Sequence, residues 1–150
     1  MREKLGEVEA RMDVTGSSKD LADRISDLPS PVRLVFFSQT FGCDSCFSAR
    51  RVIDQVADFS EKISVDEHNF VLDTDQVTKY GIEQVPALVV VEKEDLGIRY
   101  YGVPSGYEIE SIVHAVEVVS GRAAPLSTET LNVVAVLDRP VHIRVFVTPT

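Results

Sequence analysis

Two cysteines separated by two residues are the side chains best suited to chemistry in this chain. Cys43 and Cys46 are its only cysteines, and Asp44 and Ser45 lie between them. An apolar run typical of a buried strand, residues 32–37, precedes the pair, and apolar residues at helical spacing follow it. We therefore expect the pair at a strand-to-helix turn, where the helix dipole favours a thiolate and both sulfurs can close a disulfide. This context is typical of a redox motif, because the thiolate is the nucleophilic form of cysteine.

Two other interpretations of the cysteine pair stay open at this point. A structural zinc site needs four ligands, and the chain has no second cysteine pair. The three histidines match no ligand spacing; they are His68, His114 and His142. We therefore expect no metal site and no bound cofactor. The two cysteines could also be unconnected core residues, although their place between a strand and a helix favours redox chemistry.

The acidic composition argues against several classes of function. The formal net charge is −9, whereas non-specific binding to nucleic acid or to anionic membranes requires a basic surface. No apolar run is long enough to span a membrane, and residues 1–7 do not resemble a signal peptide. We therefore expect a cytoplasmic protein that binds neither nucleic acid nor membranes. In that compartment a cysteine pair is more often catalytic than structural.

Between residues 31 and 121 the periodicity predicts the order strand, helix, strand, helix, strand, strand, helix. The strands are expected near 32–37, 62–71, 86–91 and 98–103. Helices are expected near 44–59 and 105–121, and a short one is expected through Val77 to Tyr80, with the polar cluster 72–75 as its cap and Gly81 at its end. Ser105 and Glu108 form a capping box for the last helix. Two right-handed crossovers would make the first three strands parallel, and a hairpin would add an antiparallel edge. This order predicts an α/β protein of the thioredoxin fold, a mixed central sheet flanked by helices.

An additional helix is expected before this unit, near the N-terminus. Apolar stripes run through residues 5–12 and 21–28, with an interruption and a new N-cap at 15–18. Pro29 and Pro31 end the helix. The first thioredoxin-like unit therefore spans residues 1–121.

The remaining residues, 122–150, are expected to belong to a different unit. After a linker, residues 127–138 predict an amphipathic helix with Leu131, Val134 and Ala135 facing inward, and residues 140–148 predict a strand. The segment 140–148 repeats the pattern of 31–38, since each follows a helix, begins Pro-Val and has phenylalanine at the same later position. We interpret the chain as a fragment that ends in the first helix and strand of a second thioredoxin unit. Such an unpaired strand can pair with another chain, so self-association through the tail is expected.

The sequence resembles the two-unit, glutaredoxin-like protein disulfide oxidoreductases of thermophilic archaea and bacteria over essentially its whole length. The most specific stretches are GIRYYGVPSGYE at 97–108 and the ending VFVTPT at 145–150. The resemblance implies two thioredoxin folds in one chain, each with its own cysteine pair. It implies dithiol–disulfide exchange on protein disulfides and, in some members, reduction by a thioredoxin-reductase-like flavoprotein.

The resemblance also implies roles for individual residues. Cys43 would be the attacking cysteine and Cys46 the resolving one. Val85 and Pro86 match the family's Val-Pro, in which the peptide bond is cis and faces the disulfide, leaving the backbone of Val85 free to pair with a substrate segment.

The two residues between the cysteines depart from the family, which often has an aromatic residue, Gln or Pro there. The charge of Asp44 suits the helix dipole but repels a neighbouring thiolate. We therefore expect Asp44 and Ser45 to give a less acidic Cys43 and a more reducing couple. Screening at an exposed position would cancel this effect.

Other functions fit the same residues. Tandem thioredoxin folds also serve as docking or electron-relay modules, as in the N-terminal part of peroxiredoxin-reducing flavoproteins, and a dithiol can deliver a metal. The complete Cys43 and Cys46 pair favours catalysis over a scaffold. Reduction, oxidation and isomerisation all use the same chemistry, so the net direction depends on the reduction potential.

Overall fold

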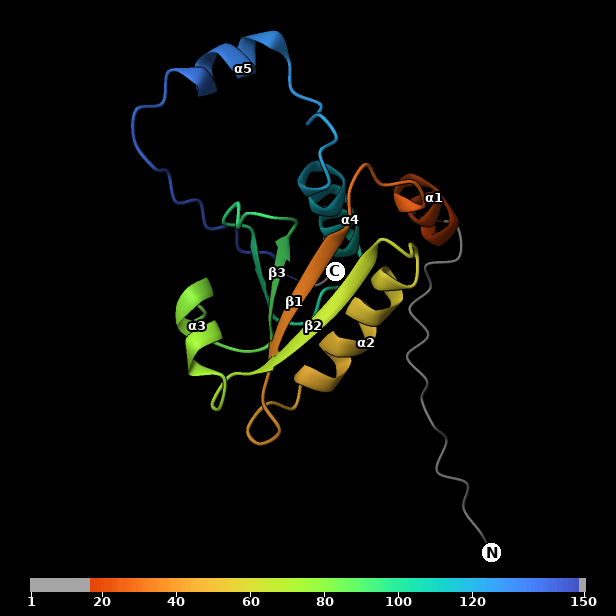
Figure 1. The fold of residues 1–150 in the computed structure, drawn as a ribbon, viewed down its shortest axis with the longest axis vertical. Helices are drawn as coiled ribbons and strands as arrows, with labels where there is room; N and C mark the ends of the chain where they lie inside the picture. Colours follow the sequence, from red (N-terminus) through yellow and green to blue (C-terminus); the bar gives the residue numbers. More distant parts are fainter. Residues whose placement is uncertain (1–16, 149–150) are drawn as a thin grey trace, which may run out of the picture.

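The structure, a computed structural model, describes residues 17–148. The apolar stripe expected at 5–12 and the final residues of the VFVTPT stretch lie outside the described residues. The described chain forms four strands and five helices (Figure 1): α1 (Ser17–Ile25), β1 (Val32–Ser38), α2 (Cys46–Ala57), β2 (Ile63–Asn69), α3 (Thr74–Tyr80), β3 (Ala87–Val91), β4 (Arg99–Tyr101), α4 (Tyr107–Val119) and α5 (Thr128–Ala135). The order from β1 to α4 confirms the order expected from periodicity.

The four strands form one mixed sheet in the order β2-β1-β3-β4. Strand β1 pairs parallel to β2 and antiparallel to β3, and β3 pairs antiparallel to β4. The expectation that the first three strands are all parallel is therefore wrong for β3.

The length of α3 explains the direction of β3. A parallel β3 would have to start at the far end of the sheet, about 20 Å from the end of β2 for a strand of this length. Helix α3 has 7 residues and advances the chain by only about 10 Å. Gly81 then ends α3 in a left-handed conformation, with φ of 61°, and the chain returns to the end of the sheet that it had just left. Strand β3 consequently starts there and runs backwards.

Helices cover both faces of the sheet, as expected. Alternate residues of β1 and β3 point to opposite faces, so Leu34 and Val90 join one buried cluster while Val35 and Val89 join another. The first cluster lies under α1, α2 and α4, and the second lies under α3 (Figure 1). Three apolar residues expected at helical spacing around α1 are buried in the first cluster; they are Leu21, Ile25 and Leu28.

The tail after α4 differs from its expected packing. Helix α5 forms within the predicted range, and the hydroxyl of Ser127 caps it by accepting a hydrogen bond from the N–H of Thr130 at 3.1 Å. However, α5 buries none of its residues and projects away from the sheet (Figure 1). Leu131 and Val134 are 50% and 49% exposed, so their expected inward orientation is wrong.

The strand expected at 140–148 is also absent from the described part of that segment. A strand is stabilised by hydrogen bonds to a neighbour, and no described strand lies against these residues.

An ion-pair network joins α1 to α4 around Glu117, whose side chain is only 15% exposed. Arg24 Nη2 lies 2.5 Å from Glu117 Oε2, and Arg122 Nη1 lies 3.0 Å from Oε1. Arg122 also donates to the carbonyl of Asp27 at 2.7 Å. Burial raises the pKa of Glu117, but hydrogen bonds and charges from Arg24 and Arg122 outweigh burial and hold this pKa below its ordinary value.

The Glu117→Gln variant should lower the free energy of unfolding by about 1–2 kcal/mol at neutral pH, because it removes a charged acceptor from two arginines. The pKa of Glu117 is lower in the folded state than its ordinary value of 4.5. The wild-type protein therefore keeps this stabilisation above that value and loses it as the pH falls through the folded-state pKa. Urea denaturation at neutral and acidic pH measures the difference between wild type and variant, which should shrink in acid. The exposed Glu61→Gln change is the control, and equal losses in the two variants would contradict the role of Glu117.

Candidate redox site

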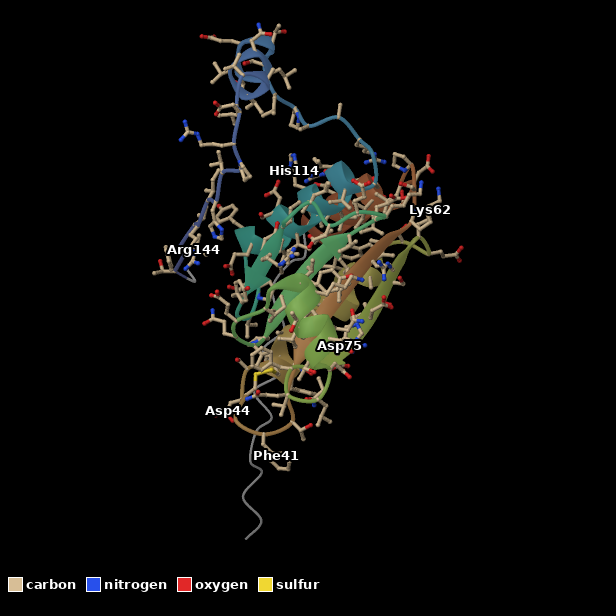
Figure 2. The ribbon with its side chains drawn as sticks, turned by 60° about the vertical axis from the view of Figure 1, so that its left-hand side comes forward. Phe41, Asp44, Lys62, Asp75, His114 and Arg144 are labelled. Atoms are coloured by element: carbon tan, nitrogen blue, oxygen red, sulfur yellow. A yellow bond between two sulfur atoms is a disulfide. The ribbon has the colours of Figure 1, made fainter. Side chains whose placement is uncertain are left out.

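Cys43 and Cys46 form a disulfide at the N-terminal end of α2. Their Cα atoms lie 5.4 Å apart, a separation that a disulfide spans without backbone movement. Figure 2 shows the bond between the sulfur atoms at one end of the molecule, on the side of Phe41 and Asp44. Unconnected core cysteines are thereby excluded. Among the described residues, no group of three or more His, Cys, Asp or Glu side chains could hold a metal ion.

Local backbone structure places the disulfide between β1 and α2. Strand β1 ends at Ser38, and the chain turns through Gly42, whose φ of 76° suits glycine. The N–H of Cys46 donates to the carbonyl of Cys43 at 3.3 Å, and Ser45 is the N-cap residue of α2. Cys43 therefore lies just before the first helical turn, as the sequence predicts, although the helix begins two residues later than expected.

The two sulfurs differ in their access to solvent. Cys46 is 6% exposed and Cys43 is half-buried. A residue that attacks a disulfide in another protein must be reachable from outside, whereas a resolving residue can remain sheltered. The difference matches the order of attack that the resemblance implies.

Polar side chains near Cys43 provide few charges that could stabilise a thiolate. The hydroxyl of Ser45 lies 3.9 Å from the sulfur of Cys43, and Asp44 is exposed to solvent. Arg50, one turn further along α2, is paired instead with Asp54 at 2.8 Å and with Glu67. Its positive charge is therefore already compensated.

The segment before β3 approaches the same end of the sheet. The Val85–Pro86 peptide bond is cis, as the resemblance implies. Ala87, the next residue, lies opposite Phe37 of β1, one residue before β1 ends in the loop that carries Cys43. Within residues 17–148 the peptide groups of Val85 have no backbone hydrogen-bond partner. Their hydrogen-bonding capacity is available to an added strand.

A set of exposed apolar residues at this end of the sheet was not predicted from the sequence. These side chains are Phe41 (88% exposed), Phe47 (74%), Val71 (63%), Leu72 (77%) and Tyr107 (84%). Phe41 and Phe47 flank the cysteine pair and were detectable from sequence. The others come from distant segments and required the sheet order.

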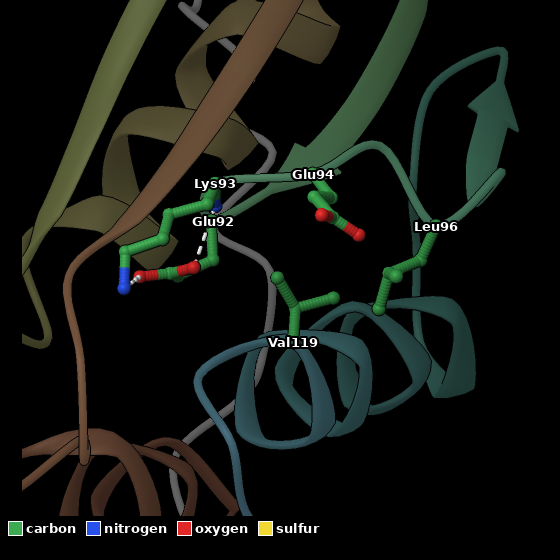
Figure 3. Close-up of a pocket in the computed structure, with 5 residues that line it drawn as sticks. All are labelled: Glu92, Lys93, Glu94, Leu96 and Val119. Carbon is green, nitrogen blue, oxygen red and sulfur yellow. Dashed lines mark hydrogen bonds and ion pairs between the residues drawn. The ribbon is translucent and has the colours of Figure 1, made fainter.

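A surface hollow lies away from the disulfide, beside the C-terminal ends of β3 and α4 (Figure 3). It measures about 230 Å³, and its lining residues are Glu92, Lys93, Glu94, Leu96 and Val119. Glu92 and Lys93 pair with each other at 3.6 Å. The hollow therefore adds no reactive group to the site.

Comparison with solved structures identifies the fold. The alkyl hydroperoxide reductase protein AhpF from Enterococcus faecalis matches with a TM-score of 0.73 and 23% identity, over 81% of this chain and 59% of that one. A protein disulfide oxidoreductase from Aeropyrum pernix matches with a TM-score of 0.68 and 21% identity, over 82% and 54%. A thioredoxin from Halobacterium salinarum matches with a TM-score of 0.52 and 19% identity, over 71% and 88%. The chain has the thioredoxin fold.

Sequence comparison finds AhpF from another organism. The AhpF protein of alkyl hydroperoxide reductase from Staphylococcus epidermidis is 26% identical over 108 residues, which are 71% of this chain. The chain spans only 19% of the length of that relative. No family model matches the sequence. In the described part of the chain, no helix has the length and apolar character needed to cross a membrane.

The Asp44→Asn variant should lower the thiol pKa of reduced Cys43, because it removes a negative charge beside the thiolate. The thiolate absorbance of the reduced protein, followed as a function of pH in low salt, measures the change. A Cys46→Ser background assigns the signal to Cys43. An unchanged thiol pKa would show that solvent screens the charge of Asp44 completely.

Proposed function

We propose that the chain is a thiol–disulfide oxidoreductase that acts on protein disulfides through Cys43 and Cys46. The observation that carries this proposal is their disulfide at the start of α2, with one accessible and one sheltered sulfur. The N-terminal end of a helix favours the thiolate that forms when this disulfide is reduced. The similarity to a protein disulfide oxidoreductase and to a thioredoxin supports the same reaction class.

The reaction proceeds by two thiol–disulfide exchanges. The thiolate of reduced Cys43 attacks one sulfur of the substrate disulfide, forms a mixed disulfide and expels the other substrate sulfur as a thiolate. The Cys46 thiolate then attacks Cys43, forms the Cys43–Cys46 disulfide and releases the reduced substrate. Two electrons pass to the substrate, and its two thiolates take up protons. The same steps in reverse oxidise a substrate dithiol.

Val85 and Pro86 would hold the substrate during these steps. An extended substrate segment that hydrogen bonds to the peptide groups of Val85 would lie alongside the start of β3. Pro86 is buried, and its carbonyl accepts a hydrogen bond from the N–H of Gly102 at 3.0 Å. The backbone at this position is therefore anchored from the side of β4.

An electron relay is the second candidate, favoured by the similarity to the AhpF proteins. In this case Cys43 and Cys46 would pass electrons from a reductase to one dedicated redox partner rather than act on many substrates. Turnover of insulin disulfides with dithiothreitol as reductant distinguishes the candidates, because a dedicated relay should reduce insulin poorly.

We further propose a glutaredoxin-like, two-unit organisation. Residues 1–121 would be a complete thioredoxin unit, and residues 122–150 would be a linker and the beginning of a second one. The repeat of the 31–38 pattern at 140–148 supports this division. A cytoplasmic setting and reduction by a thioredoxin-reductase-like flavoprotein fit the composition and the resemblance. The exposed apolar side chains of the tail support self-association through this segment.

Serine variants separate the roles of the two cysteines. Cys43→Ser should reduce insulin-disulfide turnover to the rate with dithiothreitol alone, because the attacking thiolate is missing. Cys46→Ser should retain the first exchange and accumulate a covalent mixed disulfide, which non-reducing gel electrophoresis detects. Accumulation in Cys43→Ser instead of Cys46→Ser would reverse the assignment, and full turnover in both variants would reject it.

A chain that ends after Arg122 tests the division into two units. Residues 123–148 are all exposed, so their removal should change the melting temperature by no more than about 2 °C. A much larger decrease would show that the tail is part of the folded unit. Sedimentation of the full and shortened chains tests self-association, which should be lost on shortening.

A further inference from the structure

We propose that the surface around the disulfide docks partner proteins whose own disulfide lies in a positively charged region. This inference rests on the proposed function and specifies the class of partner. It depends on three properties of the surface: which segments meet there, which apolar groups they expose and which charges they carry.

The sheet register brings four segments together beside the disulfide. Ser38 at the end of β1 lies opposite Asn69 at the end of β2, and the N–H of Phe70 donates to the carbonyl of Ser38 at 2.7 Å. Ala87 at the start of β3 lies opposite Tyr101 at the end of β4. The segments 39–45, 70–73, 81–86 and 102–106 therefore emerge at one end of the sheet. We call this end the redox face.

Several large apolar side chains on the redox face are exposed to solvent. Phe41 and Phe47 flank the disulfide, Val71 and Leu72 follow β2, and Tyr107 begins α4. A set of exposed apolar side chains around a reactive disulfide is typical of a protein-binding surface. A small-molecule site would be concave, and these side chains stand out from the surface instead.

The charges on the redox face have one sign. Its segments, together with the first turns of α2, α3 and α4, contain no lysine or arginine. Their acidic residues are Asp44, Asp73, Asp75, Glu83, Glu108 and Glu110. Asp73 and Glu108 accept hydrogen bonds from backbone N–H groups, and Glu110 faces Arg24.

Three of these carboxylates remain available to a partner. Asp44, Asp75 and Glu83 are exposed and form no ion pair within residues 17–148. Glu83 lies two residues before Val85, and Asp75 is in the first turn of α3. In Figure 2, Asp44 and Asp75 lie toward the end that carries the disulfide, whereas Lys62 lies toward the opposite end.

A surface of this sign attracts one class of partner. Opposite charge on a partner raises the encounter rate, and like charge lowers it, before any apolar contact forms. Arg50, the first cation along α2 after the disulfide, is already paired with two carboxylates. The redox face should therefore select a disulfide flanked by lysine or arginine over one flanked by acidic residues.

Three synthetic peptides test this selection. They share one intramolecular disulfide and differ only in flanking residues, which are lysine, glutamine or glutamate. Fully reduced protein, freed of reductant, reacts with each peptide in a single turnover: the Cys43 and Cys46 dithiol is oxidised to the disulfide, and the peptide disulfide is reduced to a dithiol. Each rate constant is divided by that for the same peptide with dithiothreitol, which corrects for the peptide's own reactivity.

The lysine peptide should react about tenfold faster than the glutamate peptide in low salt, and high salt should abolish the difference. The Asp75→Asn/Glu83→Gln double variant should weaken the preference, and Asp75→Lys/Glu83→Lys should reverse it. The matched control is Asp58→Lys/Glu61→Lys, which changes net charge equally at exposed positions at the other end of α2. It should retain the wild-type preference.

Equal corrected rates for all three peptides would overturn the docking inference while leaving the oxidoreductase function intact. If the control variant lost the preference for the lysine peptide as fully as Asp75→Lys/Glu83→Lys does, the preference would come from net charge. The role of the redox face would then be overturned. Failure to reduce even the glutamine peptide would reject the proposed function itself.

Discussion

The pairing of β1 with both β2 and β3 is the interaction on which the rest of the structure depends. It fixes the end of β1 inside the sheet, so that the loop carrying Cys43 and the first turn of α2 have a rigid base. The same pairing brings the Val85–Pro86 segment to that end, because β3 runs antiparallel to β1. A shift in this register would separate the disulfide from the Val85–Pro86 segment, to which we assign substrate binding.

Burial then gives the two sulfurs different properties. Helix α2 packs its apolar stripe, including Ala49, Val52 and Ile53, against the sheet. Cys46 lies on this buried side of the helix, while Cys43 precedes the helix and remains partly accessible. Core packing thus holds one sulfur in place and leaves the other at the surface. A fold that is stabilised far from the site can in this way position reactive groups at the surface.

Much of the fold and the reactive pair could be predicted from sequence, because both have local signals. Hydrophobic periodicity predicted the element order, and the Cys43 and Cys46 spacing predicted the disulfide. The direction of β3 was not predictable from periodicity, since an apolar run is the same in either direction and the short α3 decides the outcome. The prediction of a strand at 140–148 was wrong for a related reason. This segment has the sequence pattern of a strand, but a strand also needs a neighbouring strand to pair with. The gathering of Leu72 and Tyr107 beside Phe41 depends on sheet order, which no local pattern contains.

A redox function requires that the Cys43–Cys46 disulfide be reduced and re-formed within the folded protein. The most direct measurement is its redox equilibrium with glutathione, followed by mass spectrometry after acid quenching and alkylation, with circular dichroism recorded on the same samples. We expect one reversible two-electron transition, with the secondary structure unchanged across it. Reduction only when the protein unfolds would instead show that the disulfide is structural. So would a disulfide that does not re-form when the original ratio of oxidised to reduced glutathione is restored.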